Sequence, residues 1–320
     1  MSLEVDFSDS MPGPFYMDVV RGLKETPPMI PCKYLYDERG SALFDLICTQ
    51  EEYYPTSTEL GILVRHGEEI AAQIGAGVRL VELGAGSGWK TRFLLDALRE
   101  PRVYMPVDIS GSALRECARE IGAEYPDLRV EAVWADYTGE WELRKDGEEE
   151  RTVFFFPGST IGNFSRTEAK EFLRGLLSQG GRDVGLLIGV DLHKDRETLE
   201  AAYNDRKGVT AEFNLNLLRR INRECGANFA LDRFEHQAVY DEERRRIEMR
   251  LVSLCDQIVA LPEAPFMFKR GEYIVTEHSH KYRVEDFAEL SEGVGWRIRA
   301  LWTDRRHRFS VWYLEGRRVH

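Results

Sequence analysis

The stretch Arg79-Leu-Val-Glu-Leu-Gly-Ala-Gly-Ser-Gly-Trp-Lys90 decides the fold of this 320-residue chain. Its first five residues have the character of a short buried strand, and glycines follow directly at positions 84, 86 and 88. From Trp89 onward, apolar residues recur at helical spacing. The order of strand, glycine-rich turn and helix is typical of an open α/β sheet, whose ligands bind beyond the carboxyl ends of the strands.

Further strands and helices alternate along the chain after this stretch. We predict strands at 103–108, 129–136, 152–156 and 184–191, and helices at 89–100, 110–124 and 166–179. Strands that alternate with helices favour a parallel sheet with helices on both of its faces.

The C-terminal part has a different pattern. A short helix at 284–294 is followed by two apolar runs, 296–302 and 309–314, which are close enough to form an antiparallel pair. Dehydrogenases usually complete such a sheet with parallel strands, whereas an antiparallel pair is the layout of class I methyltransferases. We therefore predict an α/β fold with a Rossmann-like class I methyltransferase core.

Two segments lie outside this core. Residues 10–56 precede it, and residues 194–281 are inserted between the fifth strand and the C-terminal part. The insertion has a helical pattern and two strand-like alternations, at 213–221, 247–251 and 273–280. We predict that both segments form one α+β lobe that binds the substrate, and that 57–193 with 282–320 form the cofactor-binding core.

The composition narrows the class of protein. The chain has 43 Lys and Arg against 55 Asp and Glu, a net charge of −12, and no basic cluster, which argues against nucleic-acid binding. No apolar run reaches the ~18–20 residues of a membrane helix, and the acidic N-terminus lacks the order of a signal peptide. The five cysteines form no CxxC pair, and no set of ligands suggests a metal site. We expect a cytoplasmic monomer without a metal.

Residues at the strand ends suggest which cofactor binds. Gly84 and Gly86 allow a ligand to approach the backbone closely. Asp108 closes the second strand, where a carboxylate can accept both hydroxyl protons of a ribose, as it does in dehydrogenases. Asp136 and Tyr137 close the third, where an acid can accept from the adenine amino group while the neighbouring ring packs on it. Two such acids and the antiparallel C-terminal pair favour S-adenosylmethionine over NAD.

The same glycine-rich turn partly matches a Walker A loop. Trp89 occupies the glycine position before Lys90, however, and the spacing is one residue short. The sequence therefore argues against a phosphate-binding ATPase loop.

Four further motifs, far apart in the chain, match one pattern. They are Lys33-Tyr-Leu-Tyr-Asp-Glu-Arg-Gly-Ser-Ala-Leu-Phe-Asp45, Glu52-Tyr-Tyr-Pro-Thr56, Phe156-Pro-Gly-Ser-Thr-Ile-Gly-Asn163 and Thr276-Glu-His-Ser279. With these motifs the sequence resembles the L-histidine Nα-methyltransferases of ergothioneine biosynthesis (the EgtD family). The resemblance runs from about residue 15 to the C-terminus and includes the inserted segment.

The resemblance implies a role for each matching position. Contacts to S-adenosylmethionine are implied for Gly84, Lys90, Asp108, Asp136 and Tyr137. Residues that hold the carboxylate and the amino group of the amino acid are implied at Tyr53, Asn163 and Tyr203, with Gly158 nearby. Aromatic residues beside the amine are implied at Tyr36 and Phe44. The pair that binds the imidazole is implied at Glu277 and Ser279, and a methionine at that end of the pocket at Met249.

The chemistry of Glu277 and Ser279 agrees with histidine as the substrate. The two residues are two positions apart in a strand-like run, so their side chains point to the same face. A neutral imidazole has one donor, which a carboxylate can accept, and one acceptor, to which a hydroxyl can donate. Taken alone, the pair could also lie on a solvated strand face, and each aromatic residue could belong to the core.

We therefore expect the transfer of three methyl groups from S-adenosylmethionine to the α-amine of L-histidine, which gives hercynine. Asn163 would direct the lone pair of the amine, and the proton would leave through water or Tyr36. A related methyltransferase that acts on another amino acid, such as tryptophan, and a sensor that binds both ligands without turnover remain alternatives. Whether His278 and His280, which flank Ser279, face the pocket stays open.

Overall fold

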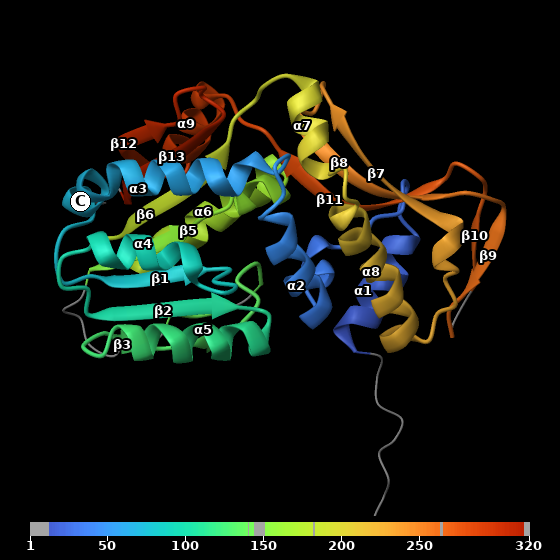
Figure 1. Cartoon of the computed structure of the whole chain (residues 1–320), viewed down its shortest axis with the longest axis horizontal. Coiled ribbons are helices and arrows are strands. Elements are labelled where there is room, and N and C mark those ends of the chain that lie inside the picture. Colours follow the sequence, from blue (N-terminus) through green and yellow to red (C-terminus); the bar gives the residue numbers. More distant parts are fainter. Residues whose placement is uncertain (1–12, 140, 144–150, 182, 263–264, 317–320) are drawn as a thin grey trace, which may run out of the picture.

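A mixed sheet of eight strands organises one half of the computed structural model, which describes residues 13–139, 141–143, 151–181, 183–262 and 265–316 (Figure 1). The strands follow the order β12-β13-β6-β5-β1-β2-β3, and β4 also pairs with β2. All pairs are parallel except β12 with β13 and β13 with β6. The bounds are β1 (Arg79–Leu83), β2 (Val103–Asp108), β3 (Arg129–Val130), β4 (Val133–Trp134), β5 (Thr152–Phe156), β6 (Gly185–Asp191), β12 (Trp296–Thr303) and β13 (Phe309–Gly316). The predicted α/β fold with an antiparallel C-terminal pair is confirmed.

Helices cover both faces of this sheet. Successive side chains of a strand point to opposite faces, so Phe155 of β5 packs with one helical layer and Phe154 with the other. The first layer consists of α3 (Tyr54–Ile74), α4 (Trp89–Ala97) and α5 (Gly111–Glu124). The second consists of α6 (Arg166–Gly180) and α9 (Val284–Gly293). Because both faces are covered, every residue of β1, β2, β5 and β6 is buried, and most of these residues are apolar, although β1 also contains Arg79 and Glu82.

One predicted strand differs from the structure. The run 129–136 forms two short strands, β3 and β4, and Asp136 lies beyond both. The carbonyl oxygens of Tyr104 and Asp108 in β2 accept hydrogen bonds from N–H groups of this run. The backbone polar groups of every second residue in a strand point to the same neighbour, so the nitrogen of Pro106 also faces the run. Proline has no N–H, so the ladder is interrupted at that point.

Helix α4 is also shorter than the predicted span 89–100. Its last residue is Ala97, and Leu98 is already extended. Glu100, directly before Pro101, has a φ of 49°, which an α-helix does not allow.

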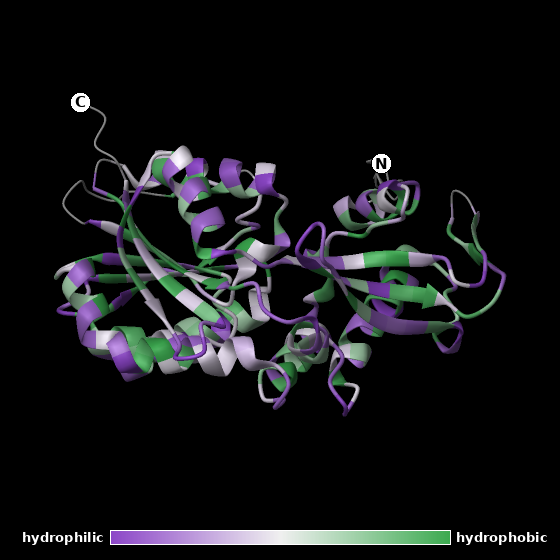
Figure 2. Ribbon diagram, turned by 90° about the horizontal axis from the view of Figure 1, so that it is seen from above, coloured by the Kyte–Doolittle hydropathy of each residue, from purple (hydrophilic) through white to green (hydrophobic). Residues whose placement is uncertain are grey.

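A second, three-stranded antiparallel sheet lies at the other end of the molecule (Figure 2). It has the order β11-β8-β7, and α8 packs against it. Its strands and the surrounding elements are β7 (Phe234–Asp241), β8 (Arg246–Ser253), β11 (Tyr273–His280), α1 (Pro14–Leu23), η1 (Cys32–Leu35), α2 (Glu38–Ile47), α7 (Arg196–Tyr203), α8 (Val209–Cys225), η3 (Leu231–Arg233), β9 (Gln257–Ala260) and β10 (Pro265–Phe268). Residues from 19–54 and 199–274 share one apolar cluster here, so the N-terminal segment and the insertion pack together.

The two sheets meet where β11 passes the loop after β5. That loop contains the short helix η2 (Thr160–Asn163), which packs against β11. A Cβ atom on Gly162 would lie 2.8 Å from the carbonyl oxygen of His280, so only glycine allows this close approach. Asn163 is thereby held beside the strand that carries Glu277 and Ser279.

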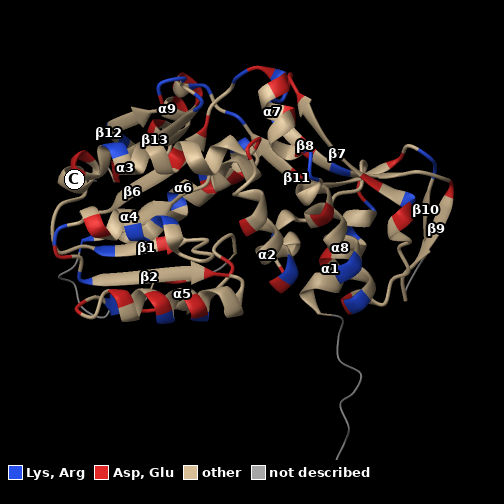
Figure 3. Ribbon diagram, viewed as in Figure 1, with Lys and Arg blue, Asp and Glu red and all other residues tan. Residues whose placement is uncertain are grey.

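Two further observations concern the surface and the helices. Basic and acidic residues are interspersed along surface helices such as α5 (Figure 3). Within the described ranges, no helix is long and apolar enough to cross a membrane.

Candidate active site

The glycine-rich turn after β1 forms the first part of the site. Gly84 and Gly86 have φ values of +77° and +52°, which glycine adopts without strain. The N–H of Gly84 donates to the carbonyl of Val107 (2.8 Å), and that of Gly86 donates to Oδ2 of Asp108 (2.9 Å). A Cβ atom on Gly84 would lie 3.4 Å from the hydroxyl of Tyr137. The structure therefore brings these four predicted residues together at one edge of the sheet.

Asp108 has capacity left to bind a ligand. Its two carboxylate oxygens accept from the N–H groups of Gly86 (2.9 Å) and Ser110 (2.7 Å). The N–H of Ile109 donates to the carboxylate as well, and a carboxylate has about four acceptor positions, so about one remains. Burial raises the pKa of this carboxyl, although the N–H donors oppose the shift. The remaining position can accept a hydrogen bond from a hydroxyl group of a ribose.

Asp136 is held by a residue from the N-terminal segment. Nζ of Lys33 lies 3.0 Å from Oδ2, and the N–H and hydroxyl of Thr138 donate to Oδ1. Burial opposes ionisation, but these hydrogen bonds lower the pKa of the Asp136 carboxyl. The ring of Tyr137 packs against Phe156 at a centroid distance of 5.8 Å. Lys33 was in a recognised motif, but its ion pair with Asp136 was not predicted.

Lys90 forms an ion pair that was not predicted. Its Nζ lies 2.7 Å from Oε2 of Glu59 in α3; the Glu59 side chain is buried and that of Lys90 is 14% exposed. The Glu59 carboxylate also accepts from the N–H of Gly158, at 2.9 and 3.0 Å. Glu59 therefore ties Lys90, after β1, to the loop after β5. Its position three residues after the Glu52–Thr56 motif was the only signal in the sequence.

Aromatic side chains form a cluster between the two sheets. Tyr36 lies 5.5 Å, between ring centroids, from both Phe44 and Phe213, and Tyr53 lies 6.2 Å from Phe44 and 6.0 Å from Tyr203. Four of these rings were predicted, and the structure brings them together with Phe213, which was not assigned to the site. Burial raises the pKa of the Tyr36 hydroxyl well above its ordinary value, so this phenol stays protonated.

Glu277 is a buried carboxylate on β11. Its side chain is 8% exposed, and no described residue donates a hydrogen bond to it. Burial raises the pKa of this carboxyl to about 7, and the positive charge of Lys281 opposes the shift. Met249 of β8 is its direct partner across the sheet, and Ser279 lies on the same face two residues further on. The structure therefore groups all three residues that were predicted to contact the imidazole.

The flanking histidines lie on the opposite face of β11. Nδ1 of His280 is 2.9 Å from the carbonyl oxygen of Gly162, and Nε2 of His278 is 3.5 Å from the Glu248 carboxylate. Alternation along the strand directs both rings away from the side of Glu277. His280 has a hydrogen-bond partner there, whereas Nε2 of His278 forms no hydrogen bond with a described residue.

Cys32 lies at the site rather than only in the core. Burial, and then the neighbouring Glu277, raise the pKa of its thiol to about 12, while a hydrogen bond with the Asn163 side chain opposes this. The thiol therefore stays protonated beside two predicted site residues. No pattern along the chain indicated this position, because Cys32 belongs to no cysteine motif.

A buried lysine completes this end of the site. Lys281 is 3% exposed, and its Nζ lies 2.9 Å from Oγ of Ser279 and 3.0 Å from the hydroxyl of Tyr203. The Tyr203 hydroxyl donates to Oγ of Ser279 (2.8 Å). Tyr203 was predicted to lie beside the carboxylate or amine of the substrate. It is thus also hydrogen-bonded to Ser279, which was predicted to bind the imidazole ring. The spacing 277, 279, 281 could have revealed Lys281 as the next residue on this face.

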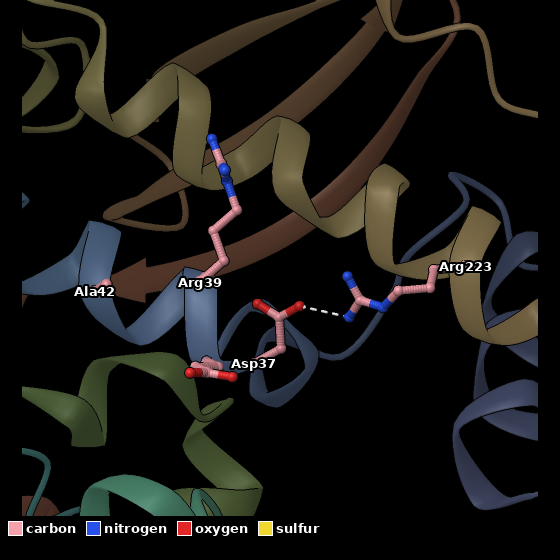
Figure 4. Close-up of a pocket in the computed structure, with 5 residues that line it drawn as sticks. Asp37, Arg39, Ala42 and Arg223 are labelled. Atoms are coloured by element: carbon pink, nitrogen blue, oxygen red, sulfur yellow. Dashed lines mark hydrogen bonds and ion pairs between the residues drawn. The ribbon is translucent and has the colours of Figure 1, made fainter.

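Helix α2, which carries Phe44, is fixed from α8. Asp37 caps the helix by accepting from the N–H of Gly40 (2.8 Å) and pairs with Arg223 at 2.8 Å. Figure 4 shows this ion pair at a surface hollow. The hollow is lined by Asp37, Glu38, Arg39, Ala42 and Arg223.

The sheet and the residues at its edge define a class of protein. An order of β12-β13-β6-β5-β1-β2-β3 with β13 antiparallel, a glycine-rich turn after β1 and an acid at the end of β2 are the features of class I methyltransferases, which depend on S-adenosylmethionine. No group of three or more His, Cys, Asp or Glu side chains suited to a metal occurs in the part of the chain that the structure describes.

Comparison with known proteins identifies the family. Residues 15–316 match the family model described as histidine-specific methyltransferase, SAM-dependent. A histidine N-alpha-methyltransferase from Mycolicibacterium smegmatis is 43% identical over 93% of this chain and 93% of its own length. The ergothioneine biosynthesis protein 1 of Neurospora crassa is 32% identical over 88% of this chain and 32% of its own length. An L-tryptophan methyltransferase from Psilocybe serbica is 28% identical over 92% of this chain and 90% of its own length.

The chain therefore belongs to the family of histidine-specific, S-adenosylmethionine-dependent methyltransferases. The resemblance found in the sequence is confirmed.

Proposed function

We propose that this protein transfers three methyl groups from S-adenosylmethionine to the α-amine of L-histidine and so forms hercynine, in the first step of ergothioneine biosynthesis. One observation carries the proposal. Glu277 is a buried carboxylate without a hydrogen-bond donor among the described residues, and the Ser279 hydroxyl lies beside it on the same strand face. A neutral imidazole supplies the missing donor and accepts from the hydroxyl.

The residues at the sheet edge suit S-adenosylmethionine, which supplies an electrophilic methyl group when it is bound. In the proposal, the remaining acceptor position of Asp108 accepts from the ribose, and Gly84 and Gly86 leave room for a ligand close to the backbone. Asp136 has about one acceptor position left for the adenine amino group, beside the ring of Tyr137.

Lys90 is proposed to contact the same ligand. It donates to Glu59, and an ammonium has three N–H groups, so two remain available to the cofactor.

Asn163, Tyr53 and Tyr203 are proposed to hold the amino and carboxylate groups of histidine, with Gly158 nearby. Asn163 lies at the end of η2, which packs against β11, so its amide can direct an amine lone pair close to the ring-binding residues. Alignment of a deprotonated amine with the methyl group can supply roughly 7–11 kcal/mol of the barrier reduction.

Tyr36 and Phe44 are proposed to surround the amine as it gains positive charge. The raised pKa of Tyr36 disfavours a phenolate, so the tyrosine would act as a neutral hydrogen-bonding group and not as a strong base. Its ring and that of Phe44 can stabilise the methylated cation by ~0.5–2 kcal/mol.

We also propose that the two sheets correspond to two lobes, a cofactor-binding core of residues 57–193 and 282–320 and a substrate lobe of residues 10–56 and 194–281. Of these ranges, residues 10–12 and 317–320 lie outside the described chain. The shared apolar cluster of 19–54 and 199–274 supports this division. A cytoplasmic location and a monomeric state remain predictions from the sequence.

Tryptophan is a weaker candidate for the substrate. An indole has one N–H and no ring acceptor, so it would satisfy Glu277 but leave the hydrogen of the buried Ser279 hydroxyl without an acceptor. An unpaired buried polar group costs about 1–3 kcal/mol.

Incubation with S-adenosylmethionine and an equimolar mixture of the twenty amino acids tests the proposal by mass spectrometry. We expect three methyl groups on histidine alone. Methylation of another amino acid would contradict the assignment of Glu277 and Ser279. Binding of both ligands without any product would instead support a sensor.

A further inference from the structure

We infer that Lys281 is a positioning residue that fixes the direction of the Ser279 hydroxyl, so that Ser279 can only donate a hydrogen bond to the ring of the substrate. The inference deepens the proposed function and rests on it. In this view, a buried lysine that does not contact the substrate determines whether a ring with a hydrogen-bond acceptor is preferred over a ring without one.

The three N–H groups of Lys281 have three acceptors. Its Nζ lies 2.8 Å from Oδ2 of Asp191, 2.9 Å from Oγ of Ser279 and 3.0 Å from the hydroxyl oxygen of Tyr203. The side chain of Lys281 is fully buried, so water does not compete for these groups. An ammonium has three donors and no acceptor, so its hydrogen-bonding capacity is used completely.

Ser279 therefore has both of its lone pairs occupied. One accepts from Lys281, and the other accepts from the hydroxyl of Tyr203 at 2.8 Å. The hydroxyl of a serine has two acceptor positions and one donor. Only its own hydrogen remains, and no described residue accepts it.

The charge of Lys281 is fixed by its surroundings. Asp191, at the end of β6, also accepts from Lys194 (2.7 Å) and from the hydroxyl of Tyr54 (2.8 and 2.9 Å). Burial alone would neutralise Lys281, but the Asp191 carboxylate raises the pKa of this ammonium. Glu277, on the same strand face, is the remaining acid near it. The lysine thus stays a triple donor and cannot exchange roles with Ser279.

The site consequently offers one acceptor, the ionised carboxylate of Glu277, and one fixed donor, the hydroxyl of Ser279. A neutral imidazole matches both with its N–H and its unprotonated nitrogen. A ring that has an N–H but no acceptor leaves the hydrogen of the buried Ser279 hydroxyl without an acceptor, and such an unpaired donor gives strong discrimination between substrates. Without Lys281, the Ser279 hydroxyl could turn and the discrimination would weaken.

The experiment compares histidine with two matched analogues, 3-(pyrrol-2-yl)alanine and 3-(pyrrol-3-yl)alanine. The ring of each analogue has an N–H and no hydrogen-bond acceptor. The ratio of kcat/KM for histidine to that for each analogue is measured for the full-length chain and for Lys281→Met, Ser279→Ala and the double variant. We expect each single substitution to lower the ratio by about tenfold or more. The double variant should lower it no further, because Lys281 acts through Ser279.

Lys281→Met leaves Asp191 paired with Lys194 and Tyr54, so no buried charge loses all its partners. Thermal unfolding and binding of S-adenosylmethionine confirm the integrity of each variant. Should Lys281→Met not fold, Lys281→Gln is compared in the same way. A lysine with only a structural role would lower kcat/KM for both substrates equally, and an unchanged ratio in an active variant would overturn the inference. Absence of histidine methylation by the unaltered chain would instead overturn the proposed function and this inference with it.

Discussion

The two ends of the candidate site are built in different ways. At the cofactor end, the glycine-rich turn after β1 meets Asp108 of β2, and their hydrogen bonds join backbone N–H groups to one carboxylate. At the substrate end, side chains from separated parts of the chain form a buried network around Lys281 and Glu277. The geometry of the cofactor end depends on where the strands of the sheet end. The geometry of the substrate end depends on which side chains come into contact.

The difference has a physical origin. The carboxyl ends of neighbouring parallel strands necessarily lie at one edge of the sheet, so local patterns suffice to place the cofactor end. Buried charges such as Lys281 and Asp191 are tolerated only when every partner is in place, and those partners come from distant segments. The two ends should therefore respond differently to substitution.

The largest effect is expected from Asp108→Ala at the cofactor end. The variant loses the acceptor for the ribose and for the N–H of Gly86, and a hydrogen bond to a charged group contributes about 1.5–3 kcal/mol. We expect the Kd for S-adenosylmethionine, measured by calorimetry, to rise by about 100-fold or more. The exposed Asp127→Ala is the matched control and should bind normally. Unchanged cofactor affinity in Asp108→Ala would remove this residue from the site.

Asn163→Ala should separate the two ends. Without the amide, the amine of histidine is no longer aligned, and misplacement of about 1 Å can lower a rate by ~100-fold. We expect kcat to fall by about that factor while the Kd for S-adenosylmethionine stays within about twofold of the original. An equal loss of cofactor affinity would mean that the two ends are not independent.

Glu277→Gln should affect histidine binding and the pH dependence of stability. The uncharged amide is a weaker acceptor for the imidazole N–H, so we expect KM for histidine to rise by about tenfold. Steady-state kinetics at saturating S-adenosylmethionine measure this change. An unaltered KM would contradict the proposed role of the carboxylate.

The stability effect of the same variant has a defined sign. Because burial raises the pKa of Glu277 to about 7, the folded protein holds a proton that the unfolded chain releases near its ordinary value of 4.5. The free energy of unfolding therefore decreases as pH rises from 4.5 to 7, by on the order of 3 kcal/mol. Glu277→Gln should raise Tm clearly at pH 8 and much less at pH 5. An equal shift at both pH values would exclude this ionisation as the cause.

Phe44→Leu should give the smallest effect. The substitution keeps an apolar side chain but removes a ring beside Tyr36, which would lose ~0.5–2 kcal/mol of cation–π stabilisation. We expect kcat for histidine to fall by about 3- to 10-fold. Phe93→Leu, at a partly exposed ring on α4, is the matched control. Equal rates in both variants would place Phe44 among the packing residues.

Sequence patterns predicted the sheet well where the pattern was local. The strand 152–156 agrees with β5 to the residue, and the antiparallel pair at the C-terminus was placed correctly. The run 129–136 failed because its continuity depended on Pro106 in the neighbouring strand. That dependence is visible only once the pairing of β2 is known.

Sequence patterns were less complete for the site. The motifs named Tyr36, Phe44, Glu277 and Ser279, and the structure groups each of these with other predicted residues. Lys33, Glu59, Cys32, Phe213 and Lys281 were not assigned, because their importance comes from partners far away in the chain.

The sequence by itself determined the class of fold, the edge of the sheet at which we propose that the cofactor binds, and the resemblance to histidine-specific methyltransferases. Strand periodicity, glycine-rich turns and short motifs are local properties that are readable along the chain. Only the tertiary structure decided how Lys33 reaches Asp136, how Glu59 joins Lys90 to the loop after β5, and how Asp191 holds Lys281 beneath Ser279. Those pairs form because a buried charge must find an opposite charge or a hydrogen-bond partner, and folding alone brings such partners together.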